Sequence, residues 1–162
     1  MNILRKTTIA TLAFSMMFFV SCEDSGSSDP ATSGTLNLTI NISNPEAWPS
    51  EGTVFVSLDK TWPPSGAPYK SVVVESSQVQ GGTISLMFDE LDFDSYKLAS
   101  ISWRDPNDAN PQTNQYVWGT HSGNMFAPTG QFIFYADATE FTFSQDMDTL
   151  SLVIDATVNT GS

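Results

Sequence analysis

Short segments in which apolar and polar residues alternate recur along this chain, and they constrain its fold more than any other feature. The clearest is residues 35–43, where Leu36, Leu38, Ile40 and Ile42 alternate with polar residues. A period of two places successive side chains on opposite faces of a β-strand, so this segment predicts a half-buried strand. No window of ten residues shows the periodicity of an amphipathic helix.

The same pattern, bounded by turn-forming residues, predicts eight or nine strands. Besides residues 35–43, the expected strands are 53–59, 70–75, 83–88, 95–103, 115–120, 131–135, 139–143 and 149–157. The strand at 70–75 contains three consecutive valines and is expected to be covered on both faces. Many short strands with near-regular turns are typical of a sandwich. We therefore expect an all-β fold, a single antiparallel β-sandwich of about 7–9 strands.

The N-terminal 22 residues have a different organisation. Arg5 and Lys6 precede an apolar run at 9–20, which is followed by Ser21 and Cys22. A positive segment and a short apolar run of this kind are typical of a signal peptide. The segment resembles the signal peptide and lipobox of bacterial lipoproteins, in which the cysteine is lipidated and becomes the mature N-terminus.

This resemblance implies a location. A lipidated Cys22 would attach the protein to membrane lipid in a bacterial cell envelope, with the outer membrane as the expected site. Phe19 and Val20 stand where the common lipobox has a leucine and a small residue, whereas Ser21 and Cys22 match it. An ordinary secretory signal with a chance cysteine and a transmembrane anchor are the two alternatives.

A polar segment follows the cysteine. Residues 23–34 contain no apolar residue larger than alanine and proline, which predicts a flexible tether. Glu23 and Asp24 resemble the acidic surface-export signals of some lipoproteins, and a plain solvated tether is the alternative. We therefore expect a signal peptide at 1–21, a lipidated cysteine and tether at 22–34, and one domain at 35–162.

Charge and cysteine content restrict the partners of that domain. All 18 acidic residues follow Cys22, with four of the six basic residues, so the mature chain carries a net charge of about −14. Such a chain is repelled by nucleic acid and by anionic lipid, so we expect no nucleic-acid partner and a membrane attachment through acyl chains alone. Cys22 is the only cysteine, so no disulfide stabilises the domain.

A second resemblance involves the middle of the chain. Phe88, Leu91 and Tyr96 form an F-x-x-L-x-x-x-x-Y run that is similar to a strand, turn and returning strand of prealbumin-like sandwiches, which include carboxypeptidase regulatory-like domains. Asp94 and Ser95 stand where that group usually has a glycine before the tyrosine. The resemblance implies a structural or accessory role. A fibronectin-like or other sandwich is the alternative.

Residues with catalytic or metal-binding chemistry are few. His121 is the only histidine, and no Gly-x-Ser-x-Gly motif is present, so we expect no enzyme and no zinc site. Asp105, Asn107, Asp108 and Asn110 place four oxygen-bearing side chains within six residues. Calcium prefers oxygen ligands, so this loop is the candidate calcium site. The alternative is that these side chains only form turns.

Two functions remain for a non-enzymatic, lipid-anchored envelope protein. One is a structural or protein-interaction role, and the other is binding of a glycan or small ligand. Trp62, Tyr69 and Trp118 are the candidate ligand-binding residues. Trp62 and Tyr69 lie on the proline-stiffened loop at 60–69, where aromatic rings supply contact area at little entropic cost. The alternative is that these rings close the end of the sandwich. A cluster of exposed rings, including Trp103, would favour a glycan.

Overall fold

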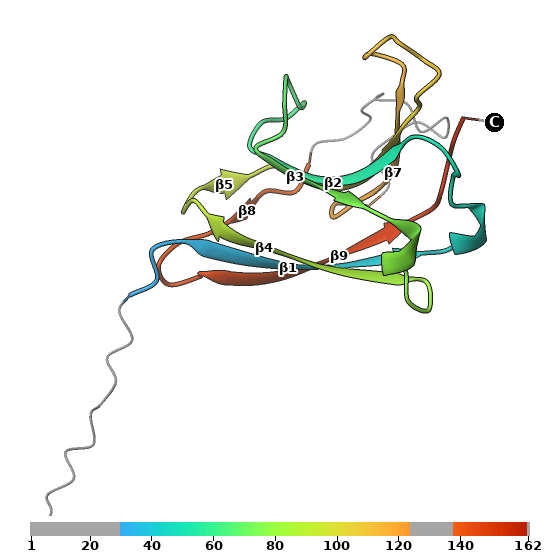
Figure 1. Ribbon diagram of the computed structural model, residues 1–162. Coiled ribbons are helices and arrows are strands. Elements are labelled where there is room, and N and C mark those ends of the chain that lie inside the picture. Colours follow the sequence, from blue (N-terminus) through green and yellow to red (C-terminus); the bar gives the residue numbers. More distant parts are fainter. Residues whose placement is uncertain (1–29, 124–137, 162) are drawn as a thin grey trace, which may run out of the picture.

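A computed structural model describes residues 30–123 and 138–161, and it confirms the all-β sandwich (Figure 1). The strands are β1 Gly34–Ile42, β2 Thr53–Asp59, β3 Lys70–Val74, β4 Thr83–Leu91, β5 Ser95–Tyr96, β6 Leu98–Arg104, β7 Gln115–Thr120, β8 Phe141–Thr142 and β9 Thr149–Ala156. Two 3-10 turns, η1 Pro45–Ala47 and η2 Ser76–Gln78, interrupt the loops. Within the described residues, no helix has the length and apolarity needed to cross a bilayer.

The strands form two layers and a small accessory sheet. One layer has the strand order β4-β1-β9, the other has the order β3-β2-β6-β7, and β5 pairs with β8. Neighbouring strands are antiparallel except β1 and β9, which run parallel from Thr35 opposite Thr149 to Ile42 opposite Ala156. The expectation of a purely antiparallel sandwich was therefore wrong for this pair. These two strands lie far apart in the sequence, so no hairpin dictates their relative direction.

The core lies between the two layers and uses the alternating residues. Leu36, Leu38 and Ile40 are at most 1% exposed, and they face the buried Val56 and Leu58 of the other layer's β2. On β1 the intervening positions are intermediate or exposed. Period-two alternation thus becomes one buried face and one wet face, as expected for a sheet covered on one side.

The predicted strand at 95–103 is divided between two sheets. Tyr96 pairs with Phe141 in the small sheet, and from Leu98 onward the chain pairs with β2 and β7. Tyr96 is fully buried, and its hydroxyl donates a hydrogen bond to the Asp92 carbonyl at 3.1 Å. Phe88 and Leu91 are buried as well, although Leu91 belongs to the end of β4 rather than to a separate turn.

Several strand boundaries differ from the sequence prediction. Gly34 already pairs with Leu91 and is buried against Phe143, so the predicted tether cannot include it. The strand expected at 139–143 is reduced to β8, and β3 ends at Val74. The strand expected at 131–135 lies outside the described residues.

One side of the sandwich is closed by contact between the layers. Thr157 donates its backbone N–H to the Trp118 carbonyl at 3.0 Å, just beyond the end of β9. A side chain at Gly119 would approach the Ile154 side chain and the Asp155 backbone to less than 3.0 Å, so only glycine permits this close crossing. On the opposite side of the sandwich, β3 and β4 are the edge strands of their sheets.

The chain direction defines two ends of the sandwich. β1 begins at Gly34, directly after the segment that was predicted to be the tether, and η1 follows at its other end (Figure 1). Nine residues in a strand span about 30 Å. The loops that follow β1 are therefore about 30 Å from the point where the domain is attached to its N-terminal segment.

Candidate functional site

His121 and Ser122 are hydrogen-bonded in a way that opposes hydrolytic catalysis. The His121 Nδ1 accepts the Ala99 backbone N–H at 3.1 Å, so Nε2 carries the proton and donates it to the Thr139 carbonyl at 2.7 Å. Ser122 Oγ lies 3.2 Å from that same protonated Nε2. A catalytic base needs an unprotonated nitrogen facing the serine and a carboxylate on the other nitrogen. His121 and Ser122 do not meet these requirements. Their hydrogen bonds instead link the end of β7 to Ala99 of β6 and to Thr139, which precedes β8.

The candidate calcium loop forms a series of turns. Asp105 Oδ1 accepts the Asn107 backbone N–H, and Asp108 Oδ1 accepts that of Asn110, both at 2.8 Å. The second oxygen of Asp108 accepts the Thr113 hydroxyl at 2.6 Å. These bonds to Thr113 and Asn110 hold the pKa of Asp108 below its ordinary value. Side-chain oxygens bonded to neighbouring backbone groups are typical of Asx turns.

No metal centre is assembled elsewhere in the described part of the chain. Within residues 30–123 and 138–161, no three His, Cys, Asp or Glu side chains are grouped so as to hold an ion. The Asn110 side-chain oxygen accepts the Gln112 backbone N–H at 3.1 Å, so it too is used locally. Calcium binding at this loop stays a prediction, and the geometry favours the turn-forming alternative.

Tryptophan side chains pack inside the sandwich instead of forming a platform. Trp118 is 5% exposed, contacts Trp48 edge to face at 5.1 Å and donates its indole N–H to the Asn159 carbonyl. Trp103 is 6% exposed and donates its indole N–H to the Glu51 carbonyl at 2.9 Å. Buried rings with satisfied N–H groups have a packing role. The flat aromatic surface that would favour a glycan ligand is therefore not formed by these residues.

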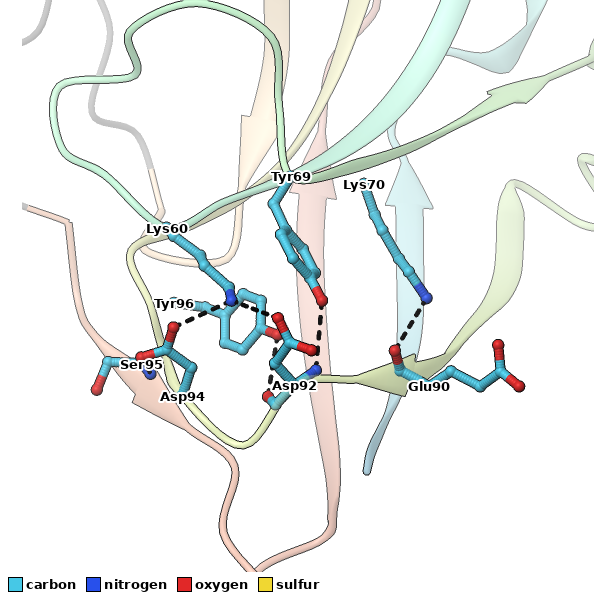
Figure 2. Close-up of polar contacts among 8 residues, drawn as sticks. All are labelled: Lys60, Tyr69, Lys70, Glu90, Asp92, Asp94, Ser95 and Tyr96. Atoms are coloured by element: carbon cyan, nitrogen blue, oxygen red, sulfur yellow. Dashed lines mark hydrogen bonds and ion pairs between the residues drawn. The ribbon is translucent and has the colours of Figure 1, made fainter. Parts of the chain in front are cut away.

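The proline-stiffened loop is fastened to the domain at its two ends (Figure 2). Tyr69 packs edge to face on the buried Tyr96 ring at 5.4 Å, and its hydroxyl accepts the Asp92 backbone N–H at 3.3 Å. Lys60 Nζ lies 4.1 Å from the centre of the Tyr69 ring and pairs with Asp92 and Asp94, at 2.8 and 3.0 Å. Tyr69 thus closes the end of the sandwich, as in the alternative stated above, and Trp62 is partly buried.

The ionic contacts of Lys60 shift the titration of its partners. Its hydrogen bond lowers the pKa of Asp92 and of Asp94 below the ordinary aspartate value. Burial acts to lower the pKa of Lys60 itself, but the two carboxylates outweigh it and hold that pKa above its ordinary value. The ion pairs of Lys60 therefore link loop 60–69 to turn 92–95 at the end of the sandwich where β1 begins. The structure does not bring Trp62, Tyr69 and Trp118 together as one site.

β3 is an edge strand of its sheet with an open side in the described part of the molecule. It pairs with β2 on one side, and on the other side no described residue forms a hydrogen bond to the backbone of residues 71–74. Val72 is 37% exposed and Val73 54%, whereas Val74 is buried at 2%. The expectation that the valine strand is covered on both faces was therefore wrong. An edge strand has no neighbour to cover it, and β-branched residues suit a strand whether or not they are buried.

A groove of about 260 Å³ adjoins the end of this strand. One wall is the loop from Trp48 to Val54, and the other is the end of β3 with the following residues, Val73 to Ser76. Gly52 has φ of +85° and packs on the Trp103 ring, where any larger residue would clash. The loop that forms the groove is thus anchored to the core by Trp103, through both its ring and its indole N–H.

The groove is acidic and lies away from the attached end of the domain. Glu51 and Glu75 are exposed among its lining residues, which include no lysine, arginine or histidine. Glu75 is held in place by η2, since its backbone N–H donates to the Gln78 side chain at 2.7 Å in a capping box. The groove follows η1, and therefore lies at the end of the sandwich opposite to the start of β1 (Figure 1).

No protein-family model matches this chain, and neither a curated protein nor a solved structure is significantly similar to it. The candidate site is therefore defined by geometry alone. It consists of the β3 edge and the groove beside it, which we call the β3 site.

Sequence reasoning placed the site elsewhere. The valine run at 72–74 and the Trp48-Pro49 loop were both visible, but nothing in the sequence indicates which strand is at an edge. Exposure of two adjacent valines depends on the sheet order, which is decided by contacts between distant segments.

Proposed function

We propose that this protein is a non-enzymatic, lipid-anchored protein of a bacterial cell envelope, and that its β-sandwich binds another protein at the β3 site. The lipid anchor is inferred from the Ser21–Cys22 lipobox, and the outer membrane is the expected location. The observation that supports a protein-binding role is the open edge of β3, with two exposed valines beside an anchored groove. Open edges with exposed apolar side chains are templates for another chain.

The position of the β3 site supports this function. Its groove lies at the end of the domain away from the predicted tether, so a partner can approach that part of the site without contacting the bilayer. The hydrogen bonding of His121 and Ser122 is unlike that of a hydrolytic Ser–His pair, which is consistent with a binding role. A glycan-binding role is less favoured, because Trp103 and Trp118 are buried.

Site-specific cross-linking in cells tests the proposal. A photo-cross-linking amino acid is introduced at Val73 of the full chain, and in a matched variant at Met87, which is 63% exposed on β4. We expect one discrete adduct with another polypeptide at position 73 that is absent at position 87 and disappears when Val72→Lys is added. The same adducts at both positions, or none, would contradict a protein-binding role for this site.

A further inference from the structure

β1 is the strand through which the domain is attached to its N-terminal segment, and it lies in the middle of its sheet. The order β4-β1-β9 gives it a hydrogen-bonded neighbour on each side. It pairs with β4 from Gly34 opposite Leu91 to Asn41 opposite Thr83, and with β9 along residues 35–42. An edge strand is held by one ladder of backbone hydrogen bonds, whereas this attached strand is held by two.

Further bonds fasten β1 to β9 at both ends of their shared ladder. The Thr35 backbone N–H donates to the Asp148 carbonyl at 2.7 Å, and that of Ser43 donates to the Ala156 carbonyl at 3.0 Å. The Ser43 hydroxyl also lies within hydrogen-bond distance of the Thr157 hydroxyl, at 2.9 Å. The two strands are therefore joined beyond the ladder, both where they begin and where they stop.

The side chains of β1 oppose any sliding of the strand. Leu36, Leu38 and Ile40 are at most 1% exposed and are packed between the two layers. A shift by one residue would move them to the wet face of the sheet, and a larger shift would draw them out of the core. Displacement of β1 along its own axis therefore breaks backbone pairing and apolar packing at the same time.

We propose that β1 is a mechanical clamp, which keeps the domain folded under tension applied through its N-terminal segment. The inference rests on the proposed function for the source of that tension, a lipid anchor on one side and a bound protein on the other. β1 and β9 run parallel, so a pull on the start of β1 against the end of β9 acts along both strands and loads all their shared hydrogen bonds together (Figure 1). A pull across the strands loads these bonds one after another, which needs less force.

Single-molecule pulling in two directions tests the clamp. The full chain is produced without acylation, so that the thiol of Cys22, the only cysteine, is the first handle in both experiments. The second handle is either a cysteine added after residue 162, beyond the end of β9, or Met147→Cys, at a residue that is 51% exposed and lies just before β9 begins.

The two arrangements load the same pair of strands differently. The handle after residue 162 pulls β1 and β9 along their axes, whereas the handle at Met147 peels them apart from the end at which both begin. At the same pulling speed, we expect the first arrangement to need at least twice the force of the second for unfolding. Forced unfolding is governed by the unfolding rate, so this comparison does not depend on the equilibrium stability that both arrangements share.

Two matched variants locate the resistance. Ile40→Ala in β1 and Ile101→Ala in β6 remove the same atoms from fully buried side chains. Urea unfolding measures the loss of equilibrium stability in each variant and checks that the fold is retained. With the handle after residue 162, Ile40→Ala should lower the unfolding force more than Ile101→Ala for the same loss of equilibrium stability, because the load enters the domain through β1.

The outcomes separate this inference from the proposed function. Equal forces in the two pulling directions, or a larger force when the strands are peeled apart, would overturn the clamp. An equal fall in force for the two alanine variants at equal loss of stability would overturn it as well. If the forces differ as expected but no cross-link forms at Val73, the clamp stands and the protein-binding function fails. If the cross-link forms and the forces are equal, the protein-binding function stands without the clamp.

Discussion

Asp59, at the end of β2, is a buried carboxyl with little support. The residue is 7% exposed, and its Oδ2 accepts one long hydrogen bond, from the Ser57 hydroxyl at 3.4 Å. Burial raises the pKa of Asp59 from 3.8 to about 6, and the bond from Ser57 opposes this only in part. A charged group in such a site destabilises the folded state unless it is well paired.

The first prediction follows from the sign of this shift. The folded state holds the Asp59 proton more tightly than the unfolded state, so stability is lost as pH rises from about 4 to about 6. Asp59→Asn cannot ionise and should be more stable than the parent at pH 7.5, by about 1–2 kcal/mol given partial solvation. Urea unfolding at pH 4 and 7.5 measures the difference, which should vanish at pH 4. A constant difference across this range would contradict the prediction.

The second prediction compares two of the candidate aromatic residues. Trp118→Ala removes a buried ring and its contact with Trp48, so it should lower the free energy of unfolding by about 3–5 kcal/mol. Trp62 is only partly buried, and Trp62→Ala should cost roughly 1–2 kcal/mol. Urea melts of the two variants test this order. An equal or larger loss at Trp62 would show that loop 60–69 is part of the core.

Loop 105–114 shows at the level of an element how composition can suggest two roles. Four Asp and Asn side chains in six residues suggested calcium, and Asn and Asp are also the residues that form turns. In the folded loop, oxygens of Asp105, Asp108 and Asn110 accept backbone N–H groups within two residues. Such bonds stabilise the loop without an ion.

The third prediction distinguishes these roles. Asp108→Ala removes two hydrogen bonds and should lower the melting temperature, whereas 5 mM calcium should leave that of the parent unchanged. Asp108→Asn keeps an acceptor oxygen for the Asn110 N–H and should have a smaller effect. A melting temperature that rises with calcium, and loses the rise in Asp105→Ala/Asp108→Ala, would establish the calcium site instead.

At the scale of the whole molecule, the two ends of the sandwich have different contacts. The end where β1 begins contains the Lys60 ion pairs and the closed Tyr69 ring, and the far end contains the groove. An acidic domain on a tether cannot bind an anionic bilayer through its own charge. Under the proposed lipid anchor, we therefore expect membrane attachment to depend on the acyl chains at Cys22.

The fourth prediction concerns that anchor. Cys22→Ala should move the protein from the membrane fraction to the soluble fraction, or leave an uncleaved precursor. The substitution removes the proposed site of acylation, and two or three acyl chains attach a protein far more strongly than one. Fractionation of cells that produce the parent and the variant, followed by detergent partitioning, measures this. A mature variant that still enters the detergent phase would exclude lipidation of Cys22 as the anchor.

The sequence by itself determined where most strands lie and which of their residues are buried. Alternation in β1 and β4 predicted the buried Leu38 and Ile84, because the side-chain period of a strand is local and is visible in any single segment. Tertiary structure alone decided how the strands are ordered. The parallel pairing of β1 and β9, with Asn41 bonded to Asp155 across 114 residues, and the exposure of Val73 at an edge depend on which distant segments meet. Local periodicity carries no information about that choice, so the β3 site became visible only in the folded molecule.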